Sequence, residues 1–294
     1  MDLDALRQIK NALVQHAHTC DFCPRFCNVD RINGETGFCN MGRDAQVASV
    51  HAHFGEEPPL VGHNGSGTVF FFGCNLGCVF CQNYEISHGN GSPVQPDELA
   101  SIFLTVQRTG CHNLNLVTPT PHILAIVEAL EIALTHGFHL PVVYNCGGYE
   151  NPEIIKLLNG IIDIYMPDLK SLDRTWSRLY LKAADYPVYA KLSIEEMYKQ
   201  VGNLRMDAGR IAKRGLLVRH LVMPNQIDDT RNIIDFLRDL CGTNGFINVM
   251  NQYRPCFEAG SYSDLNRRIS QSEWQKAIDY ATKNEITKGL DFLN

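Results

Sequence analysis

The residues best suited to chemistry are cysteines, of which this chain of 294 residues has eleven. Three of them form the run Cys74-x3-Cys78-x2-Cys81, directly after a short apolar stretch. Three thiolates on one loop can hold three corners of a [4Fe–4S] cluster, whereas a closed ferredoxin-type cluster takes four. Zinc is the competing metal, but structural zinc sites favour C-x2-C pairs with two further ligands nearby. The spacing therefore predicts a cluster with one iron open to a cofactor or substrate.

A second group has four cysteines, in the run Cys20-x2-Cys23-x3-Cys27-x11-Cys39. Four thiolates suffice for a closed site. A structural zinc ion and a second [4Fe–4S] cluster are both compatible with that number, so we expect a metal here and leave its identity open. Cysteines outside the two groups are expected to be small buried hydrophobic residues, although one at a strand end could relay a hydrogen atom; they are Cys111, Cys146, Cys241 and Cys256.

The composition limits the class of protein. Hydrophobic residues make up 45% of the chain, which is enough for a sizeable core and excludes intrinsic disorder. The 26 basic and 32 acidic residues give a net charge of −6 without a run of like charges, so we expect no nucleic-acid partner. No apolar stretch approaches the roughly 18 residues that span a membrane. The acidic start Met1-Asp2-Leu3-Asp4 does not resemble a secretory signal, and we expect a cytoplasmic protein.

The elements that must position the cysteines are readable from residue 68 onward, where apolar strands alternate with stretches of helical period. Six strands are expected, at 68–72, 113–117, 141–145, 161–166, 216–222 and 246–250. Helices are expected between Pro96 and Gly110, between Pro121 and Gly137, at 228–240, and at 272–284 after a capping box of Ser272 and Gln275. This alternation predicts an α/β fold with a parallel sheet, and six strands are too few for a closed eight-stranded barrel. We therefore expect a partial (β/α)6 barrel with its chemistry at the C-terminal ends of the strands.

The first part of the chain differs from this pattern. Residues 1–63 are expected to form a Cys-rich N-terminal extension with an opening helix and a strand or two around 46–53. The segment 55–59, Gly-Glu-Glu-Pro-Pro, is expected to end this region as a rigid loop. Residues 64–294 then form the barrel and its C-terminal helix.

Several polar residues stand at the expected strand ends. Asn145 ends the third strand, and Asp168 and Lys170 follow the fourth. Arg219 and His220 are neighbours in the fifth strand, so their side chains point to opposite faces and one should reach the lumen. There an arginine could bind a carboxylate and a histidine a ribose hydroxyl.

A C-x3-C-x2-C run after the first strand of such a barrel resembles the radical S-adenosylmethionine superfamily. Further stretches resemble one branch of it, the PflX-like proteins related to pyruvate formate-lyase-activating enzyme. The resemblance extends from about residue 15 to about residue 270, and the stretches that carry it are 53–60, 81–87, 164–170, 218–224 and 251–256.

The resemblance implies a cofactor and its site. S-adenosylmethionine would chelate the open iron through its amino and carboxylate groups, and one electron would cleave it to methionine and a 5′-deoxyadenosyl radical. Phe80 matches the residue that lies beside the adenine. Superfamily members usually place a Gly-Gly-Glu-like segment after the second strand to receive the amino group. This chain has Thr118-Pro-Thr120-Pro there, and we expect the threonines to bind instead. Asn145, Arg219 and His220 complete the expected cofactor-binding set.

The leading functional hypothesis is a radical enzyme that activates a glycyl radical enzyme by abstracting hydrogen from a glycine. An alternative is radical modification of another protein, a peptide or a small metabolite. Flavodoxin or ferredoxin is the expected electron donor. A hypothesis of another class makes the chain a non-catalytic electron carrier or metal-binding scaffold, but the open coordination position argues against it, because a carrier gains from full ligation.

Overall fold

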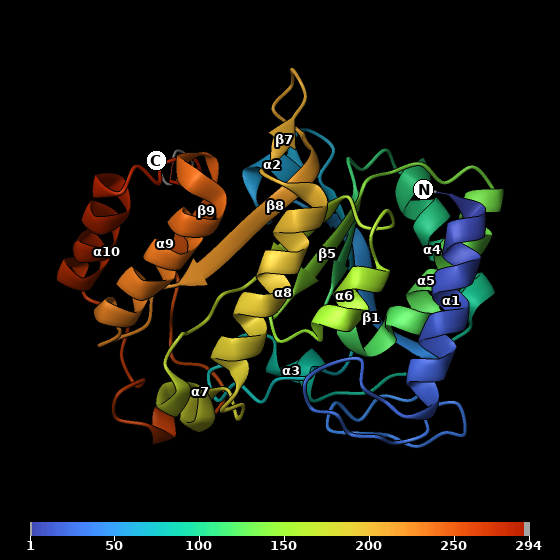
Figure 1. Cartoon of the computed structure of the whole chain (residues 1–294), viewed down its shortest axis with the longest axis horizontal. Coiled ribbons are helices and arrows are strands. Elements are labelled where there is room, and N and C mark those ends of the chain that lie inside the picture. Colours follow the sequence, from blue (N-terminus) through green and yellow to red (C-terminus); the bar gives the residue numbers. More distant parts are fainter. Residues whose placement is uncertain (1, 291–294) are drawn as a thin grey trace.

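The structure, a computed structural model, describes residues 2–290, and its centre is one sheet (Figure 1). Six of the strands are parallel neighbours, in the order β2, β4, β5, β6, β8, β9. Their bounds are β2 (Ser66–Phe71), β4 (Leu114–Val117), β5 (Val142–Cys146), β6 (Ile164–Pro167), β8 (Ala212–Leu221) and β9 (Phe246–Met250). Each coincides with one of the six expected strands, and the expectation of a partial (β/α)6 barrel is confirmed. Within residues 2–290, β2 and β9 do not pair, so the barrel stays open.

These strands form because both faces of the sheet are covered, which favours apolar side chains throughout. Val69, Leu116 and Tyr144 are completely buried. Short antiparallel strands extend the sheet at its sides. They are β1 (Ala45–His53), which pairs with β2, β3 (Pro93–Val94), which pairs with β1, and β7 (Arg205–Met206), which pairs with β8.

The four expected helices are present as α4 (Pro96–Arg108), α5 (Ile123–Thr135), α9 (Ile227–Cys241) and α10 (Gln271–Lys283). The capping box of α10 was misplaced, because Ser270 and Glu273 form it rather than Ser272 and Gln275. The sequence pattern missed the helices between β5 and β8. These are α6 (Pro152–Leu157), α7 (Arg174–Tyr180) and α8 (Tyr186–Val201). Two further helices have a single turn, α2 (Pro58–Val61) and α3 (Tyr84–Ser87).

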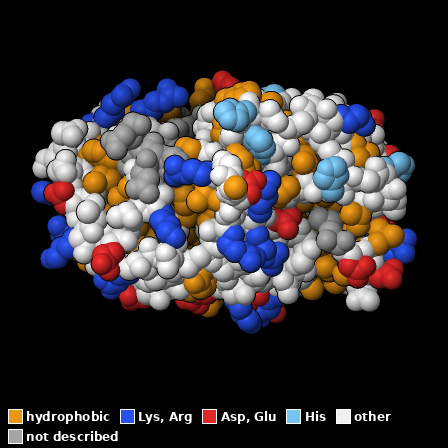
Figure 2. Space-filling view, turned by 90° about the horizontal axis from the view of Figure 1, so that it is seen from above, with side chains coloured by type: hydrophobic (Ala, Val, Ile, Leu, Met, Phe, Trp, Pro, Cys, Tyr) orange, Lys and Arg blue, Asp and Glu red, His pale blue; other side chains and the backbone are white. Residues whose placement is uncertain are grey.

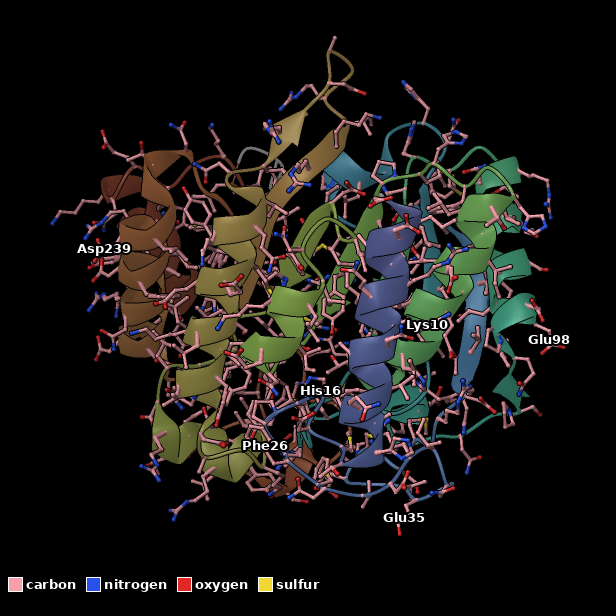
Figure 3. The ribbon with its side chains drawn as sticks, turned by 45° about the vertical axis from the view of Figure 1, so that its right-hand side comes forward. Lys10, His16, Phe26, Glu35, Glu98 and Asp239 are labelled. Atoms are coloured by element: carbon pink, nitrogen blue, oxygen red, sulfur yellow. The ribbon has the colours of Figure 1, made fainter. Side chains whose placement is uncertain are left out.

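The N-terminal extension packs onto the barrel and shares its core. Its helix α1 (Leu3–His18) lies against α5, where Lys10 pairs with Glu131 at 2.6 Å, and Leu6 and Leu13 are completely buried in the main hydrophobic core. The loop 19–44 then runs below α1 at the bottom of Figure 1, where it contacts the segments that follow β4 and β5, through Arg31 to the Pro121 carbonyl and through Asn151 to the Asp21 carbonyl. In Figure 3, Phe26 and Glu35 lie on this loop below α1. The extension thus brings the four upstream cysteines to the C-terminal ends of the strands.

The opposite face, seen in Figure 2, carries basic and acidic side chains interspersed with apolar ones. None of the helices in residues 2–290 is both long enough and apolar enough to cross a membrane.

Candidate active site

The three downstream cysteines lie on the loop that follows β2. Backbone hydrogen bonds join the loop to the C-terminal end of α7, from the Gly77 N–H to the Leu181 carbonyl at 3.1 Å and from the Val79 N–H to the Tyr180 carbonyl at 2.9 Å. Gly73 opens the loop with a φ of +76°, and a Cβ there would stand 2.9 Å from the carbonyl oxygen of Cys39. Only glycine combines this conformation with so close an approach. The triad loop is therefore packed tightly onto the upstream cysteine loop.

The thiols of the triad are close enough to influence each other electrostatically. Burial, with a smaller contribution from the neighbouring Cys81, raises the pKa of Cys74 to about 11. Burial likewise raises the pKa of Cys78 to about 12, with Cys74 and Cys81 adding to the effect and Lys170 opposing it. Free thiols at these positions would stay protonated at neutral pH, so a metal must displace their protons to bind.

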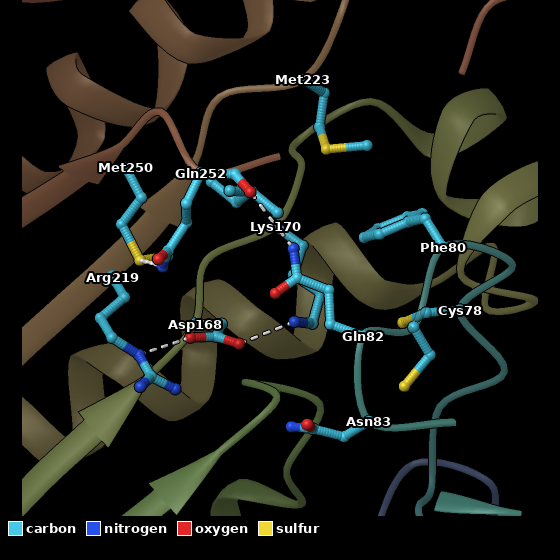
Figure 4. Close-up of a pocket in the computed structure, with 12 residues that line it drawn as sticks. Cys78, Phe80, Gln82, Asn83, Asp168, Lys170, Arg219, Met223, Met250 and Gln252 are labelled. Atoms are coloured by element: carbon cyan, nitrogen blue, oxygen red, sulfur yellow. Dashed lines mark hydrogen bonds and ion pairs between the residues drawn. The ribbon is translucent and has the colours of Figure 1, made fainter. Parts of the chain in front are cut away.

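A cavity of about 240 Å³ lies beside the triad, at the C-terminal ends of β6, β8 and β9 (Figure 4). One wall is the triad loop, and the opposite wall is charged. The lining residues are Cys78, Phe80, Cys81, Gln82, Asn83, Asp168, Lys170, Arg219, Leu221, Met223, Met250 and Gln252. Phe80 stands against Trp176 and Tyr253, with ring centroids 5.6 and 6.1 Å apart, so this part of the wall is aromatic.

Asp168 lies between two cations on the charged wall. Its carboxylate accepts from Lys170 Nζ at 2.7 Å and from Arg219 Nε at 2.8 Å (Figure 4). Burial alone would raise the pKa of Asp168, but the charges of Arg219 and Lys170 outweigh it and hold the pKa below its usual range. Lys170 uses one of its three donors on Asp168, which leaves donors for an anionic ligand.

Two carboxylates that the sequence pattern did not single out reach into the lumen from the segment 55–59. Glu56 pairs with Arg219 Nη1 at 3.1 Å and accepts from Asn115 at 3.0 Å and from Asn145 at 3.1 Å. Glu57 accepts twice from Asn248, at 2.8 and 2.9 Å, and its burial raises its pKa. The segment 55–59 therefore supports Arg219 through the ion pair with Glu56. Asparagines within otherwise apolar strands were the signal that could have revealed it.

The structure separates the expected cofactor-binding residues. Phe80 and Arg219 line the cavity. Asn145 is buried and accepts from Arg219 Nη2 at 2.8 Å, so it supports the arginine from within the lumen. Thr118, half-buried with a φ of +59°, directly follows β4 and donates its N–H to the Asn145 carbonyl at 2.9 Å.

Thr120 and His220 lie outside the cavity lining. Thr120 is buried and donates to Glu150 at 2.9 Å. His220 occupies the face opposite Arg219, where its ring nitrogens meet the Leu169 carbonyl at 2.8 Å and the Thr230 hydroxyl at 3.0 Å. Burial lowers the pKa of His220 to about 4, so the ring is neutral. Of the two neighbours in β8, alternation therefore sends Arg219 to the cavity and His220 to the opposite face, away from the position expected for a ribose ligand.

Cys146 does not reach the cavity either. It is buried beside Glu150, whose pKa is raised to about 7 by burial. A hydrogen-atom relay through this thiol does not fit its position.

The upstream cysteines surround a buried arginine. Cys20, Cys23 and Cys39 are buried, and Cys27 is half-buried. Arg31 donates from Nε to Cys20 Sγ at 2.9 Å and from Nη2 to Cys39 Sγ at 3.0 Å.

No group of three or more His, Cys, Asp or Glu side chains among residues 2–290 converges as the ligands of one metal ion do. Metal binding removes the protons of the ligands, so the metal-free positions of the side chains do not decide whether a metal fits. The test is whether the side chains are of the type and number that a metal requires. By that test the triad fits a cluster, because it offers three thiols on one loop and an adjacent cavity for a further ligand.

The chain is similar in sequence to a known protein family. A model of the radical SAM superfamily matches residues 68–237. The chain is 34% identical over 278 residues to the uncharacterized protein MJ0674 of Methanocaldococcus jannaschii, a match that covers 91% of this chain and 75% of that protein. It is 25% identical over 247 residues to the uncharacterized protein MJ0808 of the same organism, covering 76% of this chain and 67% of that one.

Among solved structures, native anSMEcpe with bound AdoMet has a TM-score of 0.50 at 12% identity, over 72% of this chain and 57% of that one. The same protein with AdoMet and the Kp18Cys peptide also gives 0.50 at 12% identity, over 74% and 59%. This chain thus spans less than two thirds of these structures, and the likeness concerns the fold.

Proposed function

The chain belongs to the radical SAM superfamily, and from that membership we propose that Cys74, Cys78 and Cys81 hold the [4Fe–4S] cluster on which such enzymes rely. The observation that carries the proposal is the position of the triad loop, which forms one wall of a cavity whose other wall is charged. When bound, the cluster would supply the electron that cleaves S-adenosylmethionine to a 5′-deoxyadenosyl radical.

The residues of the cavity would bind and orient S-adenosylmethionine. Lys170 has donors available for the carboxylate of the methionine part, and its pairing with Asp168 at 2.7 Å fixes the position of its ammonium group. Asp168 in turn could accept from the amino group. Phe80 offers an aromatic surface for the adenine, supported by Trp176 and Tyr253.

Other residues would keep the reacting region ordered and dry. Arg219 lines the cavity and is held from three sides, by Asp168 at 2.8 Å, Asn145 at 2.8 Å and Glu56 at 3.1 Å, which fixes the position of its guanidinium group. Leu221, Met223 and Met250 supply the apolar part of the lining. Exclusion of water protects a carbon radical from side reactions.

For the substrate we propose a polypeptide, with the glycine of a glycyl radical enzyme as the leading candidate. The likeness of the segments 81–87, 164–170 and 251–256 to proteins related to pyruvate formate-lyase-activating enzyme supports this choice. The anSMEcpe structure with a bound peptide is consistent with a polypeptide substrate on this fold. Modification of another protein, a peptide or a small metabolite is the alternative. We propose reduced flavodoxin or ferredoxin in the cytoplasm as the electron source.

The test is cleavage of S-adenosylmethionine by the full chain, reconstituted and reduced without oxygen. We expect wild-type protein to release 5′-deoxyadenosine and methionine, and Cys78→Ala to release neither. Cys256→Ala is the matched control, because Cys256 is half-buried and lies outside both cysteine groups. Absence of 5′-deoxyadenosine from iron-loaded wild-type protein would favour the electron-carrier hypothesis instead.

A further inference from the structure

The feature of interest is Arg31, which lies inside the upstream cysteine loop and is 2% exposed. Two of its nitrogens donate to sulfur atoms, to Cys20 at 2.9 Å and Cys39 at 3.0 Å. Its third nitrogen donates to the carbonyl oxygens of Pro121 at 2.7 Å and Gly42 at 3.3 Å. Among residues 2–290, no carboxylate forms an ion pair with Arg31.

The positive charge of Arg31 needs a negative partner in this arrangement. The guanidinium group is charged at every physiological pH, and a buried charge without a counter-charge is strongly unfavourable. Backbone carbonyls are neutral, and a neutral thiol is a weak acceptor. The acceptor side chains that contact Arg31 are Cys20 and Cys39, whose sulfurs lie 2.9 and 3.0 Å from its nitrogens. As ligands of a metal, these sulfurs would carry the negative charge that balances the guanidinium group.

The other two cysteines complete the set. Cys23 is buried in the same loop, where its carbonyl accepts a hydrogen bond from the Phe26 N–H at 3.1 Å. Cys27 accepts a hydrogen bond from the Phe38 N–H at 3.4 Å, and a Cβ at Gly37 would stand only 2.7 Å from its sulfur. The backbone turns sharply between these residues, with positive φ angles at Phe26, Asn28 and Asn40 of 42°, 56° and 58°. Backbone of this kind brings N–H groups and side chains of one short loop around a common centre.

We propose that Cys20, Cys23, Cys27 and Cys39 ligate a metal centre separate from the triad, and that Arg31 is its buried charge partner and donates hydrogen bonds to two of the ligand sulfurs. By its number of thiolates the centre accepts one zinc ion or one [4Fe–4S] cluster. Binding of a single ion would draw the ligands together, since no three such side chains among residues 2–290 already converge on one point. It stands next to the triad, because Cys39 and Cys74 line the same cavity of about 140 Å³. The Pro121 carbonyl further joins Arg31 to the turn after β4.

Metal analysis of the full chain tests this without reference to catalysis. The decisive variant replaces Cys74, Cys78 and Cys81 with Ala and leaves the upstream loop intact. We expect it to retain about four iron atoms, which identifies a cluster, or about one zinc, which identifies a structural ion. Wild-type protein should hold the same metal in addition to the four irons of the triad.

Two results would overturn the proposal. The first is a folded triad variant, judged by circular dichroism, that holds neither iron nor zinc. If that variant does not fold, wild-type protein decides, since a content of four irons and no zinc contradicts a second centre. Loss of cleavage activity with a full upstream metal content would count against the proposed function and leave this inference standing.

The role of Arg31 has its own readout. Replacement of a group that contacts metal ligands typically weakens metal affinity about 10- to 100-fold. We expect Arg31→Met to lose upstream metal in this range when challenged with a chelator, and Arg31→Lys to recover part of the affinity because it restores the charge. Arg43→Met is the matched control, since Arg43 lies on the same loop but pairs with Asp44 and Glu128. Equal metal retention by Arg31→Met and Arg43→Met would refute the assignment.

Discussion

The two cysteine loops lie side by side at the strand ends, yet they face different surroundings. The triad loop borders a cavity of about 240 Å³ in which Lys170 and Arg219 are both paired with the carboxylate of Asp168. The upstream loop encloses Arg31, which meets sulfur and carbonyl atoms. The difference suggests two tasks. Three cysteines beside a cavity in which the cations are paired can bind a metal that has a coordination position left for a cofactor. Four cysteines around a buried arginine can supply all the ligands of a metal from the protein itself.

The largest expected effect on stability comes from removing a carboxylate that pairs with Arg219 in the lumen. Glu56→Ala removes a buried partner of Arg219 and leaves the hydrogen-bonding groups of Asn115 and Asn145 without their acceptor. Breaking one side of a buried pair costs about 3–5 kcal/mol, so we expect a loss of this size in the free energy of unfolding, measured by chemical denaturation. Glu56→Gln should cost less, because it keeps the shape and an acceptor oxygen. A loss below about 1 kcal/mol for Glu56→Ala, which is typical of exposed pairs, would show that the lumen does not depend on this carboxylate.

A second prediction concerns His220, on the face of β8 that points away from the cavity. Burial lowers its pKa to about 4, whereas an unfolded histidine titrates near 6.5. Since the unfolded chain takes up the proton first, the stability that this group contributes is present above pH 6.5. It is lost as the pH falls toward 4, by about 3 kcal/mol.

The buried Glu150 acts in the opposite direction. Its pKa is raised to about 7, so its contribution is lost as the pH rises toward 7. The pH dependence of stability must therefore be compared between wild type and a variant that lacks only the His220 imidazole. Stability of His220→Gln, followed by denaturation from pH 7 to pH 4, should fall less steeply than that of wild type. His63→Gln, at an exposed position, should follow the wild-type slope. Parallel slopes for His220→Gln and wild type would contradict the buried neutral ring.

The smallest expected effect on the free energy of unfolding concerns the contact between the two cysteine loops. Gly73→Ala and Gly137→Ala both place a side chain at a positive φ, of +76° and +84°, which costs about 1–2 kcal/mol. At Gly137 the added methyl meets nothing within 4 Å, but at Gly73 it would stand 2.5 Å from Met41 and 2.9 Å from the Cys39 carbonyl. We expect Gly73→Ala to lose about 1–3 kcal/mol more than Gly137→Ala in thermal or chemical unfolding. Equal losses would mean that the loops are not packed as closely as described.

Local patterns in the sequence were sufficient for the barrel but not for all of its helices. Apolar runs buried on both faces predicted the six parallel strands, and a proline before and a glycine after the helix predicted α4 and α5. Helix α8 was missed because its buried positions, Tyr186, Ala190, Ser193, Ile194, Met197 and Val201, include aromatic and polar residues that weaken the apolar period.

The site was predictable where it depends on one loop and not where it depends on distant pairs. The triad loop could be predicted from its spacing and its position after a strand, whereas Phe80 was expected beside the adenine because of the family resemblance. The support of Arg219 by Glu56 joins residues 163 positions apart, and no local pattern contains that information. The contact between Arg31 and the Pro121 carbonyl spans 90 positions. The sequence predicted that one of Arg219 and His220 faces the lumen, but alternation alone did not say which of the two neighbours it is.

We propose that the triad holds a cluster with one position open to S-adenosylmethionine. Electron paramagnetic resonance of the reduced, iron-loaded full chain, recorded with and without S-adenosylmethionine, tests this proposal. We expect a cluster signal that changes when S-adenosylmethionine is added, a change that Cys256→Ala preserves and Cys78→Ala abolishes. An identical signal with and without S-adenosylmethionine, in protein with the full iron content of the triad, would contradict it.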